Sequence, residues 1–150
     1  MVEIKEAELG DIEGLLILVG ELGYTMTREE ERDVLRYMLE NPEYYVYLAV
    51  YQGEIVGLVS FNIKYYLHKA KPVAYIGSMV VKEGLRSLGI GKMLMAKVEE
   101  IALKRNCLSI QLNSNKRRVR AHEFYRKLGY SEVSLKFEKI LKEEYSTVSD

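Results

Sequence analysis

The spacing of hydrophobic positions in the N-terminal part of the chain predicts one short strand and two helices. Residues 2–6 alternate between apolar and polar side chains, as a strand does. Apolar residues recur at helical spacing over 12–22. Thr27 and Glu30 have the spacing of a capping box. We therefore expect a second helix that begins after Thr27 and stops before Pro42.

The middle of the chain has the pattern of three strands. Residues 45–51 are apolar and aromatic almost throughout, which is typical of a buried strand. Gln52 and Gly53 suit a tight turn, after which residues 55–65 would return as the partner strand. Residues 73–81 form another apolar run. These patterns predict a mostly antiparallel first half.

The last third of the chain changes to alternating helices and strands. Residues 90–102 predict a long amphipathic helix and 108–112 a short strand. Residues 121–128 have helical spacing, and 133–137 alternate like a strand. The expected order is β-α-α-β-β-β-α-β-α-β, a mixed α/β (α+β) sheet. Because no linker, repeat or low-complexity block interrupts the chain, we expect residues 1–150 to form one domain.

Composition and charge narrow the function classes. With 150 residues, of which 48% are hydrophobic, the chain can bury a core. Its 22 basic and 22 acidic side chains balance, which disfavours a general nucleic-acid binder. The single cysteine, Cys107, and two distant histidines offer no disulfide and no metal-ligand spacing. Without an apolar run long enough for a membrane span or a leader, we expect a soluble cytoplasmic protein.

A glycine-rich turn before the long helix is the strongest chemical signal. Gly89 and Gly91 lack side chains where a helix presents unpaired N–H groups, so the turn could bind phosphate. A P-loop would need Ser or Thr after Lys92, and a dinucleotide fingerprint would need glycine in place of Leu94. Neither motif is present. A tight turn without a ligand is the structural alternative.

Two motifs together resemble a known family. Arg86-x-x-Gly89-x-Gly91 after an apolar strand resembles the acyl-CoA pyrophosphate loop of the GNAT N-acetyltransferase superfamily. Residues 121–130, AHEFYRKLGY, resemble the signature A-x-x-F-Y-x-x-L-G-F/Y near the C-terminal end of that fold. The expected element order also matches over residues 2–140. The resemblance implies a GNAT-like fold and acetyl-CoA as cosubstrate.

The resemblance also implies which residues bind the coenzyme. In the family, the end of the fourth strand supplies backbone groups to the pantetheine arm and the thioester. The matching residues here are Met79, Val80 and Val81. The positions that match the pyrophosphate loop are Arg86, Ser87, Leu88, Gly89, Ile90, Gly91 and Lys92. Many relatives carry an asparagine where this chain has Arg118, so we expect Asn113 or Asn115 to make that coenzyme contact instead.

For catalysis, the resemblance implies that Tyr125 is the general acid toward the departing CoA thiolate. Its structural alternative is a core aromatic residue that shares the helix face of Phe124 and Leu128. The implied reaction is direct attack of a primary amine on the acetyl thioester in a ternary complex. The amine would belong to a small molecule or to a protein or peptide.

The general base remains unassigned in the sequence. Many relatives place a glutamate on the fourth strand, but residues 76–79 contain no carboxylate. Ser78 or Tyr75 through water, His68 and Glu83 are the candidates. The missing carboxylate also leaves a noncatalytic acyl-CoA-binding regulatory module as the alternative function.

Acceptor and partner assignments are less specific. Relatives often bind acceptors between the first helical pair and the middle strands, which corresponds to residues 22–27 and 65–72. The basic run from Lys116 to Arg120 opposes the dipole of the helix that follows it, which favours an anion or a partner surface beside it. A solvated basic face is the structural alternative. Nucleic acid is disfavoured because no aromatic platform accompanies the run. A terminal strand could pair across a dimer, so we expect a monomer or homodimer.

Overall fold

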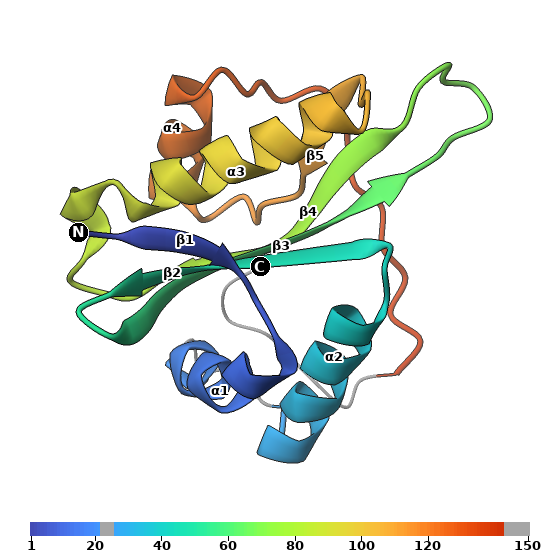
Figure 1. Ribbon diagram of the computed structural model, residues 1–150. Helices are drawn as coiled ribbons and strands as arrows, with labels where there is room; N and C mark the ends of the chain where they lie inside the picture. The colour runs from blue at the N-terminus through green and yellow to red at the C-terminus, as the bar shows by residue number, and fades with distance from the viewer. Residues whose placement is uncertain (22–25, 143–150) are drawn as a thin grey trace.

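One mixed sheet organises the chain in the computed structural model, which describes residues 1–21 and 26–142. Its strands lie in the order β1-β2-β3-β4-β5, antiparallel except for the β4–β5 pair (Figure 1). The strands are β1 (Glu3–Glu6), β2 (Tyr44–Tyr51), β3 (Glu54–Lys64), β4 (Val73–Val81) and β5 (Ser109–Leu112). The helices are η1 (Leu9–Asp11), α1 (Ile12–Gly20), α2 (Arg28–Glu40), η2 (Arg86–Leu88), α3 (Ile90–Lys104) and α4 (Val119–Lys127).

Helices cover both faces of the sheet. The helices α1 and α2 lie on one face, and α3 and α4 lie on the other (Figure 1). The first face is closed by Leu15 and Leu16 of α1 with Leu48 and Leu58 of the strands. A second set of buried residues closes the α3 face: Val59, Phe61, Ile76, Ile90, Leu94 and Val98. Burial on both faces explains why β2 and β3 are apolar almost continuously.

The predicted capping box is confirmed at the start of α2. Thr27 Oγ1 accepts a hydrogen bond from the Glu30 N–H at 3.1 Å, and Glu30 Oε1 accepts from the Thr27 N–H at 2.8 Å. The helix ends at Glu40, before Pro42, as expected. The prediction for α1 ran to Leu22, which lies outside the described residues, and the described helix ends at Gly20.

The strand predicted over 133–137 is wrong for this structure. Residues 130–140 have no strand partner, and Val133, Leu135 and Phe137 are 81%, 76% and 88% exposed. Alternation of side chains specifies two faces, but a strand also needs a hydrogen-bonded edge. In the structure β5 pairs with β4, and the alternating segment does not join the ladder. The other predicted strands and helices all form, within a few residues of the expected bounds.

Gly57 determines how closely α3 approaches the sheet. A Cβ atom built there would lie 3.0 Å from Ile90 Cγ2, 3.1 Å from Leu94 Cδ1 and 3.3 Å from Ala49 Cβ. A side chain at Gly57 would therefore push the N-terminal half of α3 away from β3. The position of this helix matters because its first turn borders the candidate site.

We predict that Gly57→Ala lowers the free energy of unfolding by about 1–3 kcal/mol, because the added methyl group overpacks the interface. Urea denaturation measures the change. Gly10→Ala is the matched control, because a Cβ atom at Gly10 meets nothing within 4 Å. Equal stability of the two variants would contradict the close approach of α3.

Candidate active site

The pairing of β4 with β5 ends halfway along β4, where β5 itself ends. Their parallel ladder joins Val73–Ile76 to Ser109–Leu112 and ends there, whereas β4 remains paired with β3 up to Val81. At the same point β4 contains an extra residue, Gly77, because Ser60 pairs with Ser78 and Phe61 pairs with Ile76. Such a bulge increases the local twist. Residues 77–81 therefore present main-chain groups that no described strand pairs on the β5 side.

The side chains of the last three β4 residues are used in packing. Val80 belongs to the core beneath α1 and α2, whereas Met79 and Val81 pack against the core beneath α3. Met79, Val80 and Val81 can therefore contact a ligand mainly through their main-chain groups. This agrees with the kind of contact that the sequence predicts for them.

The N-terminus of α3 faces this opening without a cap. Gly89, the N-cap residue, has φ 74°, a left-handed conformation that favours glycine. The first bond of the helix runs from the Met93 N–H to the Gly89 carbonyl at 3.0 Å. Among the described residues, none provides an acceptor for the N–H groups of 90–92, and the first turn contains no acidic side chain. These donors, together with the helix dipole, suit an anion.

The side chains around these donors add positive charge. Arg86 in η2 and Lys92 in α3 are both exposed. Ser87 and Leu88 complete η2 and are exposed as well, whereas Ile90 is fully buried beneath the helix. Of the predicted pyrophosphate-loop positions, Ile90 can therefore contribute only its main chain.

Gly91 has a different role from Gly89. A Cβ atom at Gly91 would lie 3.1 Å from Phe124 Cζ and 3.6 Å from Met79 Cε. The absent side chain therefore lets α4 and β4 pack against the first turn of α3. The sequence predicts both glycines as phosphate-loop residues, and the structure adds this packing constraint for Gly91.

Tyr125 on α4 combines a buried ring with a protonated hydroxyl. The residue is 9% exposed, and its ring centre lies 5.2 Å from that of Phe124 and 5.8 Å from that of Tyr130. Burial raises the pKa of Tyr125, and the charge of Arg118 partly opposes that rise. The phenol is therefore a proton donor near neutral pH. The ring belongs to the core beneath α3, so the structural role predicted for Tyr125 is present.

The loop between β5 and α4 is held by its own backbone. Asn115 Oδ1 accepts from the Arg117 N–H at 3.1 Å, and the Asn115 carbonyl accepts from the Arg118 N–H at 3.0 Å. His122 Nε2 lies 2.8 Å from that carbonyl oxygen. Asn115 is thus committed to the turn through its side-chain oxygen. Ser114, which no sequence motif marks, has a buried hydroxyl without a partner in the described residues.

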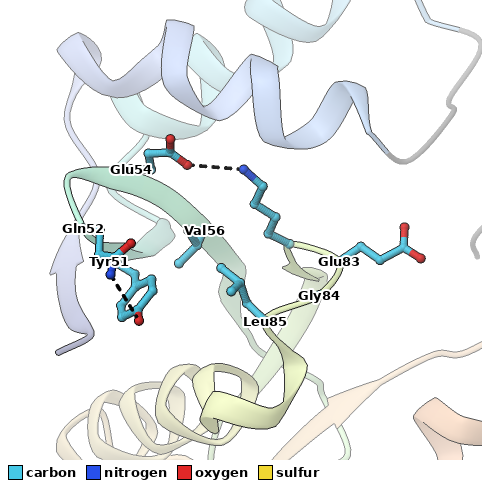
Figure 2. A pocket seen from close by; sticks show the side chains of 8 residues that line it. Tyr51, Gln52, Glu54, Val56, Glu83, Gly84 and Leu85 are labelled. Atoms are coloured by element: carbon cyan, nitrogen blue, oxygen red, sulfur yellow. Dashed lines mark hydrogen bonds and ion pairs between the residues drawn. The ribbon is translucent and has the colours of Figure 1, made fainter.

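The four candidates for a general base occupy different places. Ser78 lies at the β4 bulge beside Ser60, and the hydroxyl of Tyr75 accepts a hydrogen bond from the Asn113 amide. His68 is exposed in the β3–β4 connection. Glu83 is exposed in the turn after β4 and points away from Glu54 (Figure 2). Ser78 is the candidate at the opening itself.

A separate pocket of about 270 Å³ lies between the β2–β3 hairpin and the turn after β4 (Figure 2). Glu54 and Lys82 form an ion pair at its edge, with 3.3 Å between Oε2 and Nζ. The charge of Lys82 is therefore engaged outside the glycine turn. No group of three or more His, Cys, Asp or Glu side chains that could hold a metal occurs in residues 1–21 and 26–142.

Comparisons with known proteins agree on one family. The model of the acetyltransferase (GNAT) family matches residues 17–130. The chain is 31% identical to aminoalkylphosphonate N-acetyltransferase of Salmonella typhimurium, over 93% of this chain and 91% of that protein. It is 27% identical to thialysine N-epsilon-acetyltransferase of Bos taurus, over 89% of this chain and 86% of that protein. The crystal structure of aminoglycoside N-acetyltransferase AAC(6')-Iy with CoA shares the fold, with TM-score 0.85, 16% identity and coverage of 95% and 96%.

Tyr130, which contacts Tyr125, has a raised pKa that can be measured. Loss of solvent raises the pKa of Tyr130 to about 12, with smaller contributions from Glu99 and Tyr125. The pKa of a tyrosine in an unfolded chain is about 10. Because the folded pKa is the higher one, the stabilising contribution of Tyr130 is present below pH 10 and is lost as the pH rises toward 12.

We predict a late phase near pH 12 in the absorbance titration of the tyrosines, and its disappearance in Tyr130→Phe. The free energy of unfolding should also fall less steeply above pH 10 in that variant. A titration identical in the two proteins would show that the hydroxyl of Tyr130 is not shielded from solvent enough to raise its pKa.

Proposed function

The chain belongs to the GNAT acetyltransferase family, and from that membership we propose that it acetylates the primary amine of a small molecule. The family model spans most of the chain, and the Salmonella relative matches nearly all of it. The protein is an acetyl-CoA-dependent N-acetyltransferase. The observation that carries the site assignment is the opening between β4 and β5 in front of the uncapped N-terminus of α3.

The coenzyme positions follow from the unpaired main-chain groups. We propose that the pantetheine arm binds along Met79, Val80 and Val81, where β4 has no partner on the β5 side. The diphosphate would bind to the N–H groups at the start of α3. Arg86 and Lys92 add attraction for its charge, whereas Asn115 can contribute its amide nitrogen, since its oxygen is engaged in the turn.

The reaction needs one bond formed and one broken. The amine nitrogen attacks the thioester carbon, the C–N bond forms, and the C–S bond then breaks with its electron pair on sulfur. Main-chain N–H groups at the β4 bulge can stabilise the developing oxyanion. We propose that the Tyr125 hydroxyl gives its proton to the departing sulfur. With both groups at their ordinary pKa values, near 8.5 for a thiol and near 10 for a phenol, complete transfer would cost about 2 kcal/mol. The raised pKa of Tyr125 adds to that cost.

The amine must lose its ammonium proton before it attacks. An alkylammonium group has a pKa of about 10.4, so a base or a water chain is required near neutral pH. We propose Ser78, acting through water, as the relay from the amine to solvent, because it lies at the bulge. The absence of a carboxylate on β4 is therefore compatible with catalysis, and family membership favours the enzyme over a noncatalytic binding module.

The acceptor class is suggested by the relatives. Aminoalkylphosphonates and thialysine, which the names of two relatives give as acceptors, each combine an amino group with an acidic group in a small molecule. We propose an acceptor of that type for this chain. None of its described helices has the length and apolar composition that crossing a bilayer requires. The cytoplasmic location and the monomeric or homodimeric state stay predictions from the sequence.

We predict that the protein releases CoA thiol from acetyl-CoA in the presence of small amines that carry an acidic group. Tyr125→Phe should lower kcat by about 100-fold, which is typical of a lost general acid, and leave the affinity for CoA unchanged. A thiol-reactive dye follows the reaction, and calorimetry gives the affinity.

The matched control is Tyr130→Phe, which removes a hydroxyl from a ring that contacts Tyr125 and should retain the wild-type rate. If Tyr125→Phe turns over as fast as the wild type, Tyr125 is not the acid. If no amine in the panel releases thiol, the proposed acceptor class is wrong.

A second prediction concerns the diphosphate. Ser87→Asp places a negative charge on the exposed turn just before Gly89, and should weaken CoA binding at least about tenfold through repulsion between like charges. Ser87→Asn introduces a side chain of nearly the same shape as aspartate but without its charge, and should bind CoA like the wild type. Equal affinities of both variants would place the diphosphate elsewhere.

A further inference from the structure

A row of polar side chains lies on the sheet face opposite α3, near the opening between β4 and β5. Phe61, Ile63, Ala74 and Ile76 belong to the core beneath α3, so the residues that alternate with them face the other way. The polar residues on this other face near the opening are Ser60, Asn62 and Lys64 of β3, Tyr75 and Ser78 of β4, Gln111 of β5, which pairs with Tyr75, and Asn113 directly after β5. Lys64 is not one of the residues proposed to bind the coenzyme.

Three of these side chains, one from each strand region, are in contact. Lys64 Nζ lies 3.9 Å from the centre of the Tyr75 ring, a cation–π distance. The Tyr75 hydroxyl accepts a hydrogen bond from the Asn113 amide. A phenol that accepts still has its own proton to donate. The cluster therefore presents a held ammonium group and a hydroxyl donor, with Lys64 and Tyr75 half-buried and Asn113 exposed.

The charge of Lys64 is not neutralised by the described residues. None of them provides a carboxylate that pairs with Lys64, whereas Lys82, Lys97 and Lys104 each pair with a glutamate. The adjoining residues 65–72 contain His68, Lys69 and Lys71 but no acidic residue. This end of the face is therefore positive, although the whole chain has a net charge of zero. An anion is the ligand that such a site suits.

The spacing along β4 relates this cluster to the reacting carbonyl. Tyr75 precedes the bulge at Gly77 by two residues, which corresponds to about 7 Å of strand. The proposed reaction places the attacked carbon at the bulge. An acceptor with its amine there and an anion at Lys64 would have roughly two or three carbon atoms between the two groups.

We propose that Lys64, with the Tyr75 hydroxyl and the Asn113 amide, binds the acidic group of the acceptor, a phosphonate or a carboxylate. This assignment rests on the proposed function, because it takes the bulge as the place of acetyl transfer. Lys64 acts as a specificity residue in this scheme. It fixes the acceptor by its anion and takes no part in bond making or proton transfer.

Steady-state kinetics with three acceptors test the assignment: 2-aminoethylphosphonate, β-alanine and propylamine, which lacks an acidic group. Lys64→Met keeps much of the side-chain length without the charge. It should raise KM for the two acidic amines by about tenfold or more, as expected for a lost charge-assisted contact, and leave kcat unchanged. Propylamine should be acetylated equally by both proteins. Whichever of 2-aminoethylphosphonate and β-alanine shows the larger rise in KM in Lys64→Met carries the anion that the site prefers.

Two variants serve as controls. Lys64→Arg retains the charge and should recover most of the affinity for the acidic amines. Lys127→Met removes an exposed lysine from α4, on the other face of the sheet, and should behave like the wild type, so a general effect of lost charge would be recognised. Thermal melting verifies that all variants fold. Equal effects of Lys64→Met on acidic and neutral amines, or no effect on either, would overturn the assignment.

A binding measurement separates this assignment from the proposed function. Methylphosphonate, which has the anion but no amine, is titrated calorimetrically into the CoA-loaded protein. Saturable binding to the wild type that is lost in Lys64→Met supports the subsite even if none of the three amines is acetylated. Absence of binding to the wild type overturns the subsite, whereas thiol release from any amine would still uphold the acetyltransferase activity.

Discussion

The end of the β4–β5 ladder at the Gly77 bulge is the constraint on which the site depends. Four residues of β4 pair with β5, while the rest of β4 stays paired with β3. Because β5 ends at Leu112, main-chain groups of β4 that a longer β5 would satisfy remain available for a ligand. The close packing of α3 on Gly57 then brings the unpaired N–H groups of that helix to the same opening.

This arrangement explains how the chain can function with few charged catalytic side chains. The groups that would meet the thioester and the diphosphate are backbone donors, whose positions are determined by strand pairing and helix geometry. Such donors need no reorientation when charge develops. Tyr125 fits the same pattern, because its ring is fixed in the core while burial keeps its hydroxyl protonated. In the proposed mechanism, Tyr125 thus serves both packing and chemistry.

In the proposed scheme, the charge distribution separates the binding places of the two substrates. Arg86 and Lys92 lie beside the α3 N-terminus, where the coenzyme would place its negative charge, and Lys64 lies on the opposite sheet face near β5. Between them the bulge carries uncharged groups, which suits a neutral amine at the moment of attack. The balanced net charge of the chain conceals this pattern, because acidic side chains elsewhere offset these cations and glutamates pair with Lys82, Lys97 and Lys104.

The sequence alone determined the features that depend on residues close together in the chain. The capping box of α2, the glycine-rich turn before α3 and the two family motifs are such features, because each requires specific residues within a few positions. Only the tertiary structure decided where β4 leaves β5, why Gly91 must be small, and that Lys64 meets Tyr75. It also left residues 133–137 outside the sheet despite their alternation. Pairing and packing join residues distant in the chain, and local periodicity does not specify which partners meet.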